Sequence, residues 1–366
     1  MSAAITAKKL NPNLDILILE KKDEPGKKII ASGNGKCNMS NVNCLHHEKI
    51  LDFFSRLGVL TRTDSEGRIY PYTEESKVVT EALTSELKRL KVRVKSNTAV
   101  VNVKKNEDFI ITTEKGETIT ANKLLVSCGG KAAPKLGTTG DGYKLAKGLG
   151  HSVTKVVPVL TAIDVKEDTK SLAGIRAKSN VSLFFKGQEI FSEFGEVQFT
   201  KDGVSGICIF NMSRFLLVPP GKNMKNGFDD YEIFIDFFPG GENVAQLLKD
   251  RRDNMGLGGV TILRSLVREP LAQKIYEKAG DNIEELAREL HHFVLHPKGA
   301  KGWDFAQVTK GGVPLDEINQ ETMESRIWDG LFFSGEIIDF DGPCGGYNLE
   351  NAWETGIKAG RKIANV

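Results

Sequence analysis

Residues Leu14–Glu20 read Leu-Asp-Ile-Leu-Ile-Leu-Glu, and this stretch decides the fold class. Such a nearly continuous aliphatic run is typical of a parallel strand that is buried on both faces. A helical segment, Ala3–Leu10, precedes it and is stopped by Asn11-Pro12-Asn13. An acid at the carboxyl end of such a strand, here Glu20, is placed to hydrogen-bond ribose hydroxyls in a dinucleotide-binding fold. An exposed strand-end acid is the alternative interpretation of Glu20 taken alone.

Three parts of the chain share one arrangement, in which a buried strand leads into glycines and then into a helix. The first strand runs into a long Gly-, Ser-, Asn- and Lys-rich loop over 21–43, a length more typical of functional loops. Lys123–Ser127 runs into Cys128-Gly129-Gly130, and Gly330–Ser334 runs into Gly335-Glu336 before the turn Gly342–Gly346 opens a helix over 348–364. Glycines let the backbone approach a diphosphate or a ring, and helix N-termini supply free N–H groups and positive charge. The sequence therefore predicts an α/β, Rossmann-like domain.

The character of the sequence changes at about residue 157 and changes back at about residue 303. The intervening part alternates like strands over 182–185, 189–191, 196–199 and 231–237, and then looks helical over 243–253, 259–278 and 283–293. We therefore predict a discontinuous nucleotide-binding domain over 1–156 and 303–366. An inserted β-rich subdomain over 157–242 and an inserted helical subdomain over 243–302 complete the predicted organisation.

Composition limits the function classes. The 366 residues carry 50 basic and 48 acidic side chains, and the net charge is +2. The region 157–302 holds 19 basic and 20 acidic residues, so composition gives no nucleic-acid footprint. The aliphatic runs are too short to cross a bilayer, and the first residues do not resemble a secretory signal. We expect a cytoplasmic protein with no DNA and no membrane partner.

The cysteines and histidines argue against metal and disulfide chemistry. The five cysteines contain no C-x-x-C pair, which fits a reducing compartment. His292 and His296 have the i, i+4 spacing of helical metal ligands, but no third ligand stands at a convincing spacing. The better interpretation is a partly exposed helix end that Pro297 stops. We expect no metal site.

A dinucleotide fold also needs a G-x-G-x-x-G loop about 20 residues before its strand-end acid. Counting back from Glu20 reaches Met1 before any such loop. We expect that the segment holding this loop is absent from the sequence, through a start assigned downstream or a fragment. An enzyme that works without the loop is the alternative.

Ordered motifs over nearly the whole chain carry a family resemblance. The loop Ser32-Gly33-Asn34-Gly35-Lys36-Cys37-Asn38-Met39-Ser40-Asn41 is the first, followed by Gly67-Arg68-Ile69-Tyr70-Pro71 and Gly137-Thr138-Thr139-Gly140-Asp141-Gly142. The last are Ser334-Gly335-Glu336 with Asp339, and Gly345-Gly346-Tyr347-Asn348. The chain resembles the BaiN/RdsA family of FAD flavoproteins, sometimes labelled aminoacetone-oxidase-like.

The resemblance implies a two-dinucleotide-binding-domain flavoprotein and a set of cofactor residues. Glu20 is expected at the FAD ribose, and the turn Gly345–Asn348 is expected to place a helix N-terminus beside the flavin pyrimidine ring. A glycine-rich turn chosen only for tight packing is the alternative for that turn. The full expected FAD set is Glu20, Lys21, Ser32, Gly33, Asn34, Gly35, Lys36, Cys37, Asn38, Val101, Cys128, Gly129, Gly130, Gly335, Glu336, Asp339, Gly345, Gly346, Tyr347 and Asn348.

The same resemblance implies hydride addition from NAD(P)H through FAD to an activated C=C bond. Uridine in ribosomal RNA is the leading expected substrate, and a steroid-like enone or an amine is the alternative. No second Rossmann fingerprint is present, so NAD(P)H is expected to dock transiently at the flavin. Cys37 is the candidate proton donor because it lies in the flavin-facing loop, and a small buried hydrophobe is its alternative role. A flavin-binding protein without catalysis is the hypothesis from another class.

Overall fold

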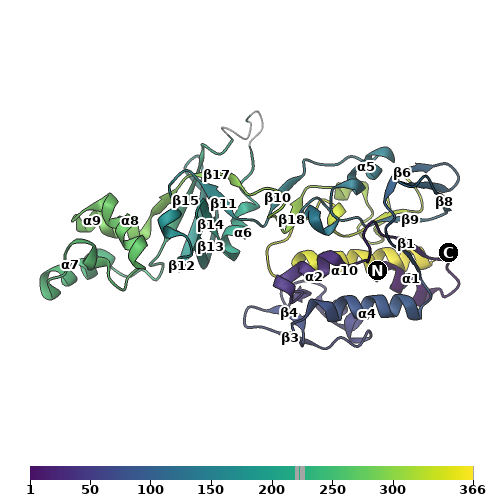
Figure 1. Ribbon diagram of the computed structural model, residues 1–366, viewed down its shortest axis with the longest axis horizontal. Coiled ribbons are helices and arrows are strands. Elements are labelled where there is room, and N and C mark those ends of the chain that lie inside the picture. Colours follow the sequence, from purple (N-terminus) through teal and green to yellow (C-terminus); the bar gives the residue numbers. More distant parts are fainter. Residues whose placement is uncertain (219–221, 223–226, 366) are drawn as a thin grey trace. The chain divides into compact units, whose positions relative to one another are not determined.

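The computed structural model describes residues 1–218, 222 and 227–365. Residues 219–221 and 223–226, within the predicted range 157–242, and residue 366, within the predicted range 303–366, lie outside this description. The chain divides into two compact units, one over Met1–Val157 and Val308–Val366 and the other over Pro158–Gln307. Figure 1 shows the helices and strands of both units, coloured along the sequence.

Unit 1, over 1–157 and 308–366, combines short parallel strands with helices and small antiparallel sheets. Its helices are α1 (Ser2–Leu10), α2 (Lys27–Ala31), α3 (His47–Ser55), α4 (Ser76–Arg89), α5 (Asp141–Gly148) and α10 (Tyr347–Ala364). Its strands are β1 (Leu17–Leu19), β2 (Ser40–Asn41), β3 (Thr61–Thr63), β4 (Arg68–Pro71), β5 (Arg93–Lys95), β6 (Val100–Lys105), β7 (Phe109–Thr113), β8 (Thr118–Ala121), β9 (Leu124–Val126), β18 (Val308–Lys310) and β19 (Leu331–Phe333). Short 3-10 turns are η1 (Ser32–Gly35), η2 (Pro134–Leu136), η5 (Leu315–Glu317) and η6 (Gly335–Ile337). The strand β10 (Val157–Val159) spans the boundary between the two units.

The parallel strands of unit 1 form two separate pairs, β1 with β5 and β9 with β19. One edge of β1 and one edge of β9 have no paired strand among the described residues. Within the described residues, the backbone N–H and C=O groups of Leu17, Leu19 and Leu125 have no hydrogen-bond partner. The side chains of Leu17, Leu19 and Leu125 are also only half-buried, although their aliphatic character predicts burial on both faces.

Helices α1 and α10 pack closely, which places the start of α1 beside the core of unit 1. A Cβ added at Gly356 would lie 2.3 Å from Ser2 Oγ, and one added at Gly360 would lie 2.4 Å from Ala3 O. Only glycine therefore permits this approach. Trp353 of α10 then packs on a buried cluster that includes Ile5, Ile50 and Phe54, with the Trp353 and Phe54 rings 5.1 Å apart.

Unit 2, over 158–307, is built on an antiparallel sheet in the order β16-β15-β12-β13-β14-β11-β17. The bounds of these strands are β11 (Ile163–Val165), β12 (Arg176–Phe185), β13 (Gln188–Phe199), β14 (Gly203–Ser205), β15 (Tyr231–Asp236), β16 (Phe293–Leu295) and β17 (Pro297–Ala300). Its helical elements are η3 (Lys170–Leu172), α6 (Ile207–Ser213), α7 (Val244–Met255), η4 (Gly259–Leu263), α8 (Glu269–Ala279) and α9 (Ile283–His291). One hydrophobic cluster runs through the strands and the helices, so both share a core.

Two local expectations for unit 2 are wrong. The helix expected over 259–278 is broken between η4 and α8, because Ser265 adopts a positive φ of 66° and Pro270 fits only the first turn of a new helix. His292 and His296 do not share a helix, because α9 ends at His291 and the next residues form β16. Among the described residues, no group of three or more His, Cys, Asp or Glu side chains is arranged to hold a metal ion.

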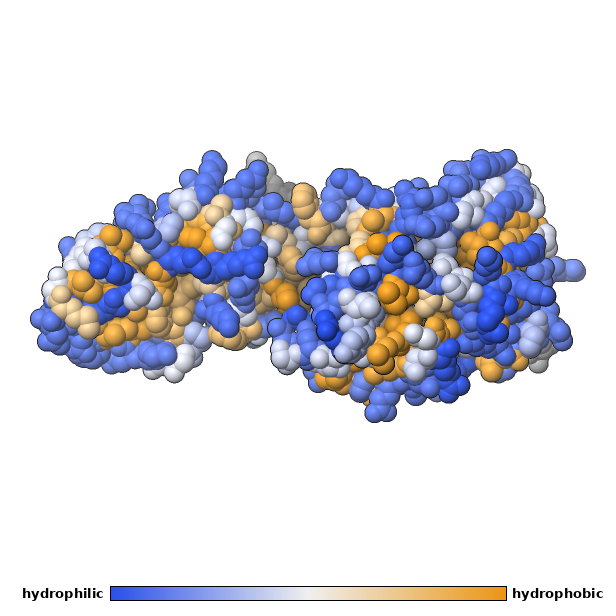
Figure 2. Space-filling model, turned by 60° about the horizontal axis from the view of Figure 1, so that its bottom comes forward, coloured by the Kyte–Doolittle hydropathy of each residue, from blue (hydrophilic) through white to orange (hydrophobic). Residues whose placement is uncertain are grey.

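The surface alternates in polarity. Figure 2 shows hydrophobic residues in separate patches among hydrophilic ones on the face drawn. None of the helices in the described part of the chain has the length and apolar character needed to cross a membrane.

Candidate cofactor site

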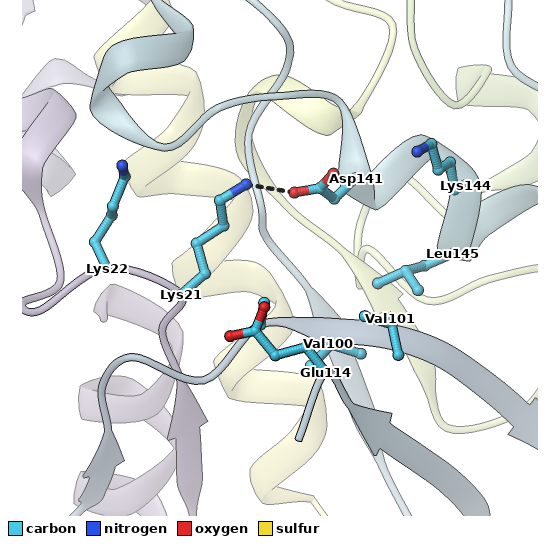
Figure 3. Close-up of a pocket in the computed structure, with 9 residues that line it drawn as sticks. Lys21, Lys22, Val100, Val101, Glu114, Asp141, Lys144 and Leu145 are labelled. Atoms are coloured by element: carbon cyan, nitrogen blue, oxygen red, sulfur yellow. Dashed lines mark hydrogen bonds and ion pairs between the residues drawn. The ribbon is translucent and has the colours of Figure 1, made fainter. Parts of the chain in front are cut away.

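A cavity of about 400 Å³ lies in unit 1, next to the residues that follow β1. It is lined by Lys21 and Val101, both expected at the cofactor, and by Asp141 and Lys144 of α5 (Figure 3). The Lys21 side chain points at Asp141, with 2.6 Å between Lys21 Nζ and Asp141 Oδ2. Residues from three separate segments therefore meet at one hollow.

Asp141 and Lys144 were absent from the expected cofactor set. The available signal was the position of Asp141 directly after Gly140, where an acid suits the first turn of a helix. Burial alone would raise the pKa of Asp141, but hydrogen bonds from Lys21 and Thr139 lower it below its usual value. The carboxylate is therefore ionised and already held by a cation.

Glu20 lies at the carboxyl end of β1, as the sequence predicts. Its Oε1 accepts a hydrogen bond from the backbone N–H of Lys22 at 2.8 Å, which turns the carboxylate back over the strand end. The charge of Glu20 also reaches the α-amino group of Met1, whose pKa burial lowers to about 6 while Glu20 opposes that shift. Glu20 thus stands close to the N-terminal end of α1, where positive dipole charge favours an anion.

The loop over 32–38 exposes its backbone. Gly33, Asn34 and Gly35 all have positive φ, at 56°, 55° and 85°, and all three are exposed. A Cβ added at Gly33 would lie 2.8 Å from the backbone nitrogen of Asn38, so the bend requires glycine there. The Lys36 ammonium pairs with Glu74 at 2.6 Å.

The structure brings this loop to the N-terminus of α10. With the Asn38 amide turned so that both its groups are satisfied, its oxygen accepts from Gly346 N at 3.2 Å and its nitrogen donates to Ser40 O at 2.9 Å. Asn348 closes the preceding turn by accepting from Gly342 N at 2.8 Å. In the part of the chain that the structure describes, the backbone N–H groups of Tyr347 and Asn348 have no partner, so the helix end is open to a ligand.

Most of the remaining expected residues contact other parts of the protein. Glu336 accepts from Thr309 N at 2.8 Å and also pairs with the Lys28 ammonium. A Cβ added at Gly130 would lie 2.3 Å from Thr309 Oγ1. Asp339 accepts from Thr154 Oγ1 at 2.8 Å. Gly129 packs against Thr138 and Gly335 against Ala352, while Ser32 donates to Ile29 O and Cys128 is exposed. Contact of these residues with a cofactor stays a prediction.

Cys37, the candidate proton donor, is fully buried in the cluster that contains Met39 and Phe54. Burial raises the pKa of its thiol to about 12, partly offset by a hydrogen bond with Ser32. The thiol is therefore protonated at neutral pH, as a proton donor must be, but it faces neighbouring side chains in this structure.

The residues that are present suit a dinucleotide with an attached ring system. The cavity offers space and cations beside a strand-end acid, which is the usual setting for an adenosine and its ribose. The open N-terminus of α10 and the exposed glycine backbone over 33–35 suit an anionic ring, because free N–H groups and positive dipole charge meet there.

The chain is similar to proteins of known family. Residues 45–362 match the family described as HI0933-like protein Rossmann domain. The chain is 34% identical to the 3-dehydro-bile acid delta(4,6)-reductase of Clostridium scindens, over 99% of this chain and 96% of that protein. It is 25% identical to the ribosomal RNA dihydrouridine synthase of Escherichia coli, over 93% of this chain and 90% of that protein. The corresponding Haemophilus influenzae protein is also 25% identical, with the same coverage.

A solved structure of the open conformation of a flavocytochrome c3 fumarate reductase aligns with 100% of this chain and 75% of its own, at 16% identity and a TM-score of 0.49. The family match spans most of the chain, and the reductase relative is similar over nearly its full length. The chain therefore belongs to the HI0933-like Rossmann family, the BaiN/RdsA family of FAD-dependent oxidoreductases.

Proposed function

We propose that the protein is an FAD-dependent reductase that saturates a C=C bond conjugated to a carbonyl group. The observation that best supports this proposal comes from two kinds of relative, each similar over at least 90% of its own length. Their names describe this same transformation. A delta(4,6)-reductase saturates ring C=C bonds, and dihydrouridine is uridine saturated at the bond next to its carbonyl.

The chemistry requires one hydride and one proton. Bound FAD would supply the two-electron chemistry that links oxidation of NAD(P)H to reduction of the alkene. The neighbouring carbon needs a proton from an acid, and NAD(P)⁺ and the saturated product balance the reaction. The chain itself would hold the cofactor through the cavity at Lys21, the acid Glu20 and the α10 N-terminus, and Cys37 stays the candidate acid.

For the substrate, a small steroid-like enone is the first candidate. The relative with the higher identity acts on a bile acid by its name, and the region 157–302 is nearly neutral. An RNA substrate needs cationic side chains that are free to meet phosphates.

One surface observation favours uridine in ribosomal RNA as the second candidate. Arg251 donates to the backbone oxygen of Arg264 at 2.6 Å, which gathers two arginines, and Arg268 follows at the start of α8. None of the three forms an ion pair with an acid among the residues that the structure describes, whereas Lys249 and Arg252 do.

The test combines two assays on FAD-loaded protein. Steady NADH or NADPH oxidation should depend on an added 3-keto steroid with C=C bonds at positions 4 and 6, and the product should be heavier by two hydrogens per reduced bond. Mass analysis of ribosomal RNA from a deletion strain should show unchanged dihydrouridine if the first candidate is right, and a lost dihydrouridine if the second is right. The proposal fails if the steroid does not stimulate NADH or NADPH oxidation and the deletion strain also keeps its ribosomal RNA dihydrouridine.

A further inference from the structure

Glu350 is a buried acid in the first turn of α10, three residues after the helix begins at Tyr347. Its side chain is 4% exposed. One carboxylate oxygen accepts from the Ser40 hydroxyl, and the other accepts from the backbone N–H of His46 at 3.2 Å. Glu350 therefore joins the end of the loop that begins at Ser32 to the first turn of α10.

Neighbouring contacts make this junction continuous. The Trp353 indole donates to Met39 O at 3.2 Å, and Asn41 Nδ2 donates to Gly345 O at 3.1 Å. A Cβ added at Gly346 would lie 2.3 Å from Ser40 O, so the two backbones are in direct contact. We call the segment 38–46 with the first two turns of α10 the clasp.

The charge of Glu350 is not neutralised by a cation. It accepts from a hydroxyl and a backbone amide and also contacts the Cys44 thiol, and no Lys, Arg or His among the described residues forms an ion pair with it. Burial first, and then the Glu350 charge, raises the pKa of the nearby Cys44 thiol to about 11. One turn further on, Glu354 differs, because it pairs with His46 at 2.8 Å and with Lys358 at 3.0 Å.

An uncompensated anion in the first turn of a helix reduces the positive potential that its N-terminus presents. Low surrounding dielectric strengthens this effect, because water does not screen a buried charge. A ring that becomes anionic on reduction, held at this N-terminus, would then be harder to reduce than it would be without the acid.

We propose that Glu350 is a positioning residue with two effects: it holds the cofactor loop against α10, and its negative charge lowers the reduction potential of the flavin bound there. The inference rests on FAD binding at the α10 N-terminus, which is part of the proposed function. It does not rest on the identity of the substrate.

The first experiment separates charge from shape. Glu350→Gln keeps an acceptor for His46 N and a polar group for Ser40, but removes the charge. We expect retained FAD and a higher midpoint potential, with the reduced form favoured by at least about threefold at fixed poise. Glu354→Gln is the matched control, since the Glu354 charge is already paired, and should leave the potential unchanged. Equal potentials for Glu350→Gln and wild type would overturn the electrostatic role.

The second experiment tests the clasp. Glu350→Ala leaves Ser40 and His46 N without their acceptor, so we expect faster FAD dissociation and faster protease cleavage within 38–46. Wild-type dissociation and cleavage rates in this variant would overturn the positioning role. Both experiments use no substrate, so they are independent of the reaction. Failure of the wild-type protein to bind FAD at all would instead contradict the proposed function.

Discussion

At the residue scale, Glu20 carries the clearest binding prediction. Its carboxylate is half-buried at the strand end, beside the cavity and the start of α1. Glu20→Ala should weaken FAD binding by roughly tenfold to a hundredfold, because a charged hydrogen bond contributes about 1.5–3 kcal/mol. Titration of FAD fluorescence measures this. Asp15→Asn, at an exposed acid that pairs with Arg93 near the other end of the strand, should bind FAD normally. Equal affinities for the two variants would remove Glu20 from the site.

Cys37 carries the catalytic prediction. Cys37→Ala should retain FAD and lose most turnover with the enone, because the carbon next to the carbonyl would have no proton donor. Rapid mixing should show normal flavin reduction by the nucleotide and slow reoxidation by the enone. Cys208→Ala removes another buried thiol, in unit 2, and should keep wild-type turnover. If Cys37→Ala also turned over normally, its thiol would be a packing group, as its complete burial favours.

Individual site residues could be predicted where a local rule applies. Glu20 follows from strand-end chemistry, and Lys21 and Val101 from family resemblance; the last two do line the cavity. Asp141 and Lys144 were missed because their approach to Lys21 depends on where α5 begins in space. The ion pair of Glu336 with Lys28 and its hydrogen bond from Thr309 N also join distant segments, and no local pattern in the sequence predicts them.

At the element scale, a buried histidine links α5 to the segment before β19. His151 contacts Glu317 Oε2 through Nδ1 and Ser325 Oγ through Nε2, both at 2.8 Å. Ser325 Oγ also accepts from the backbone of Ile327 and Trp328, so its proton is free to go to the imidazole. The ring of Phe333 lies edge-on at 4.7 Å. This arrangement holds a neutral imidazole in a dry site.

This histidine predicts a pH dependence. Burial lowers the pKa of His151 below 6.5, and Glu317 only partly opposes the shift. The unfolded chain therefore takes up a proton below about pH 6.5 that the folded chain does not, so stability falls as the pH drops through that range. Thermal unfolding should show a lower Tm at pH 5.5 than at pH 7.5. His151→Gln should unfold at a lower Tm throughout but with a flatter profile over this interval. A wild-type Tm that does not change between these two pH values would contradict the prediction.

Elements with strong periodicity were predictable, and short ones were not. The helix α10 and the strand β15 lie where their patterns place them. The small sheet β2-β4-β3 has strands of two to four residues, which is too short for a period to register. The division between η4 and α8 was missed because the helical apolar spacing continues across Ser265, whose backbone breaks the helix.

At the scale of the whole molecule, the change of sequence character near 157 and 303 reflects a change of architecture. Buried runs followed by glycines belong to unit 1, where parallel strands need both faces covered. Alternating runs belong to unit 2, whose antiparallel sheet packs α6 to α9 against its core. The close α1–α10 contact, by contrast, depends on Gly356 and Gly360 meeting residues about 350 positions away, a pairing that no local pattern reveals.

The unpaired edges of β1 and β9 carry the last prediction. Leu19 of β1 packs against the cluster that contains β9, and Lys21 reaches Thr139 and Asp141 beyond the end of β9. The two strand ends are thus near each other, yet Leu17, Leu19 and Leu125 have no backbone partner in the described chain. Each backbone N–H or C=O group that is left without a hydrogen bond costs up to about 1–3 kcal/mol of stability where water is excluded.

A parallel strand supplied between β1 and β9 should therefore stabilise unit 1, and a G-x-G-x-x-G turn after it should add N–H groups for a diphosphate. We expect that preceding Met1 by such a strand and turn raises the Tm and tightens FAD binding relative to the 366-residue chain. The control carries the same strand with each glycine of the turn replaced by valine, which should raise the Tm without tightening FAD. Differential scanning calorimetry and FAD titration make the comparison. If the 366-residue chain already holds one FAD per chain after dialysis, and the added strand changes neither quantity, the open edges have no role in stability or in FAD binding.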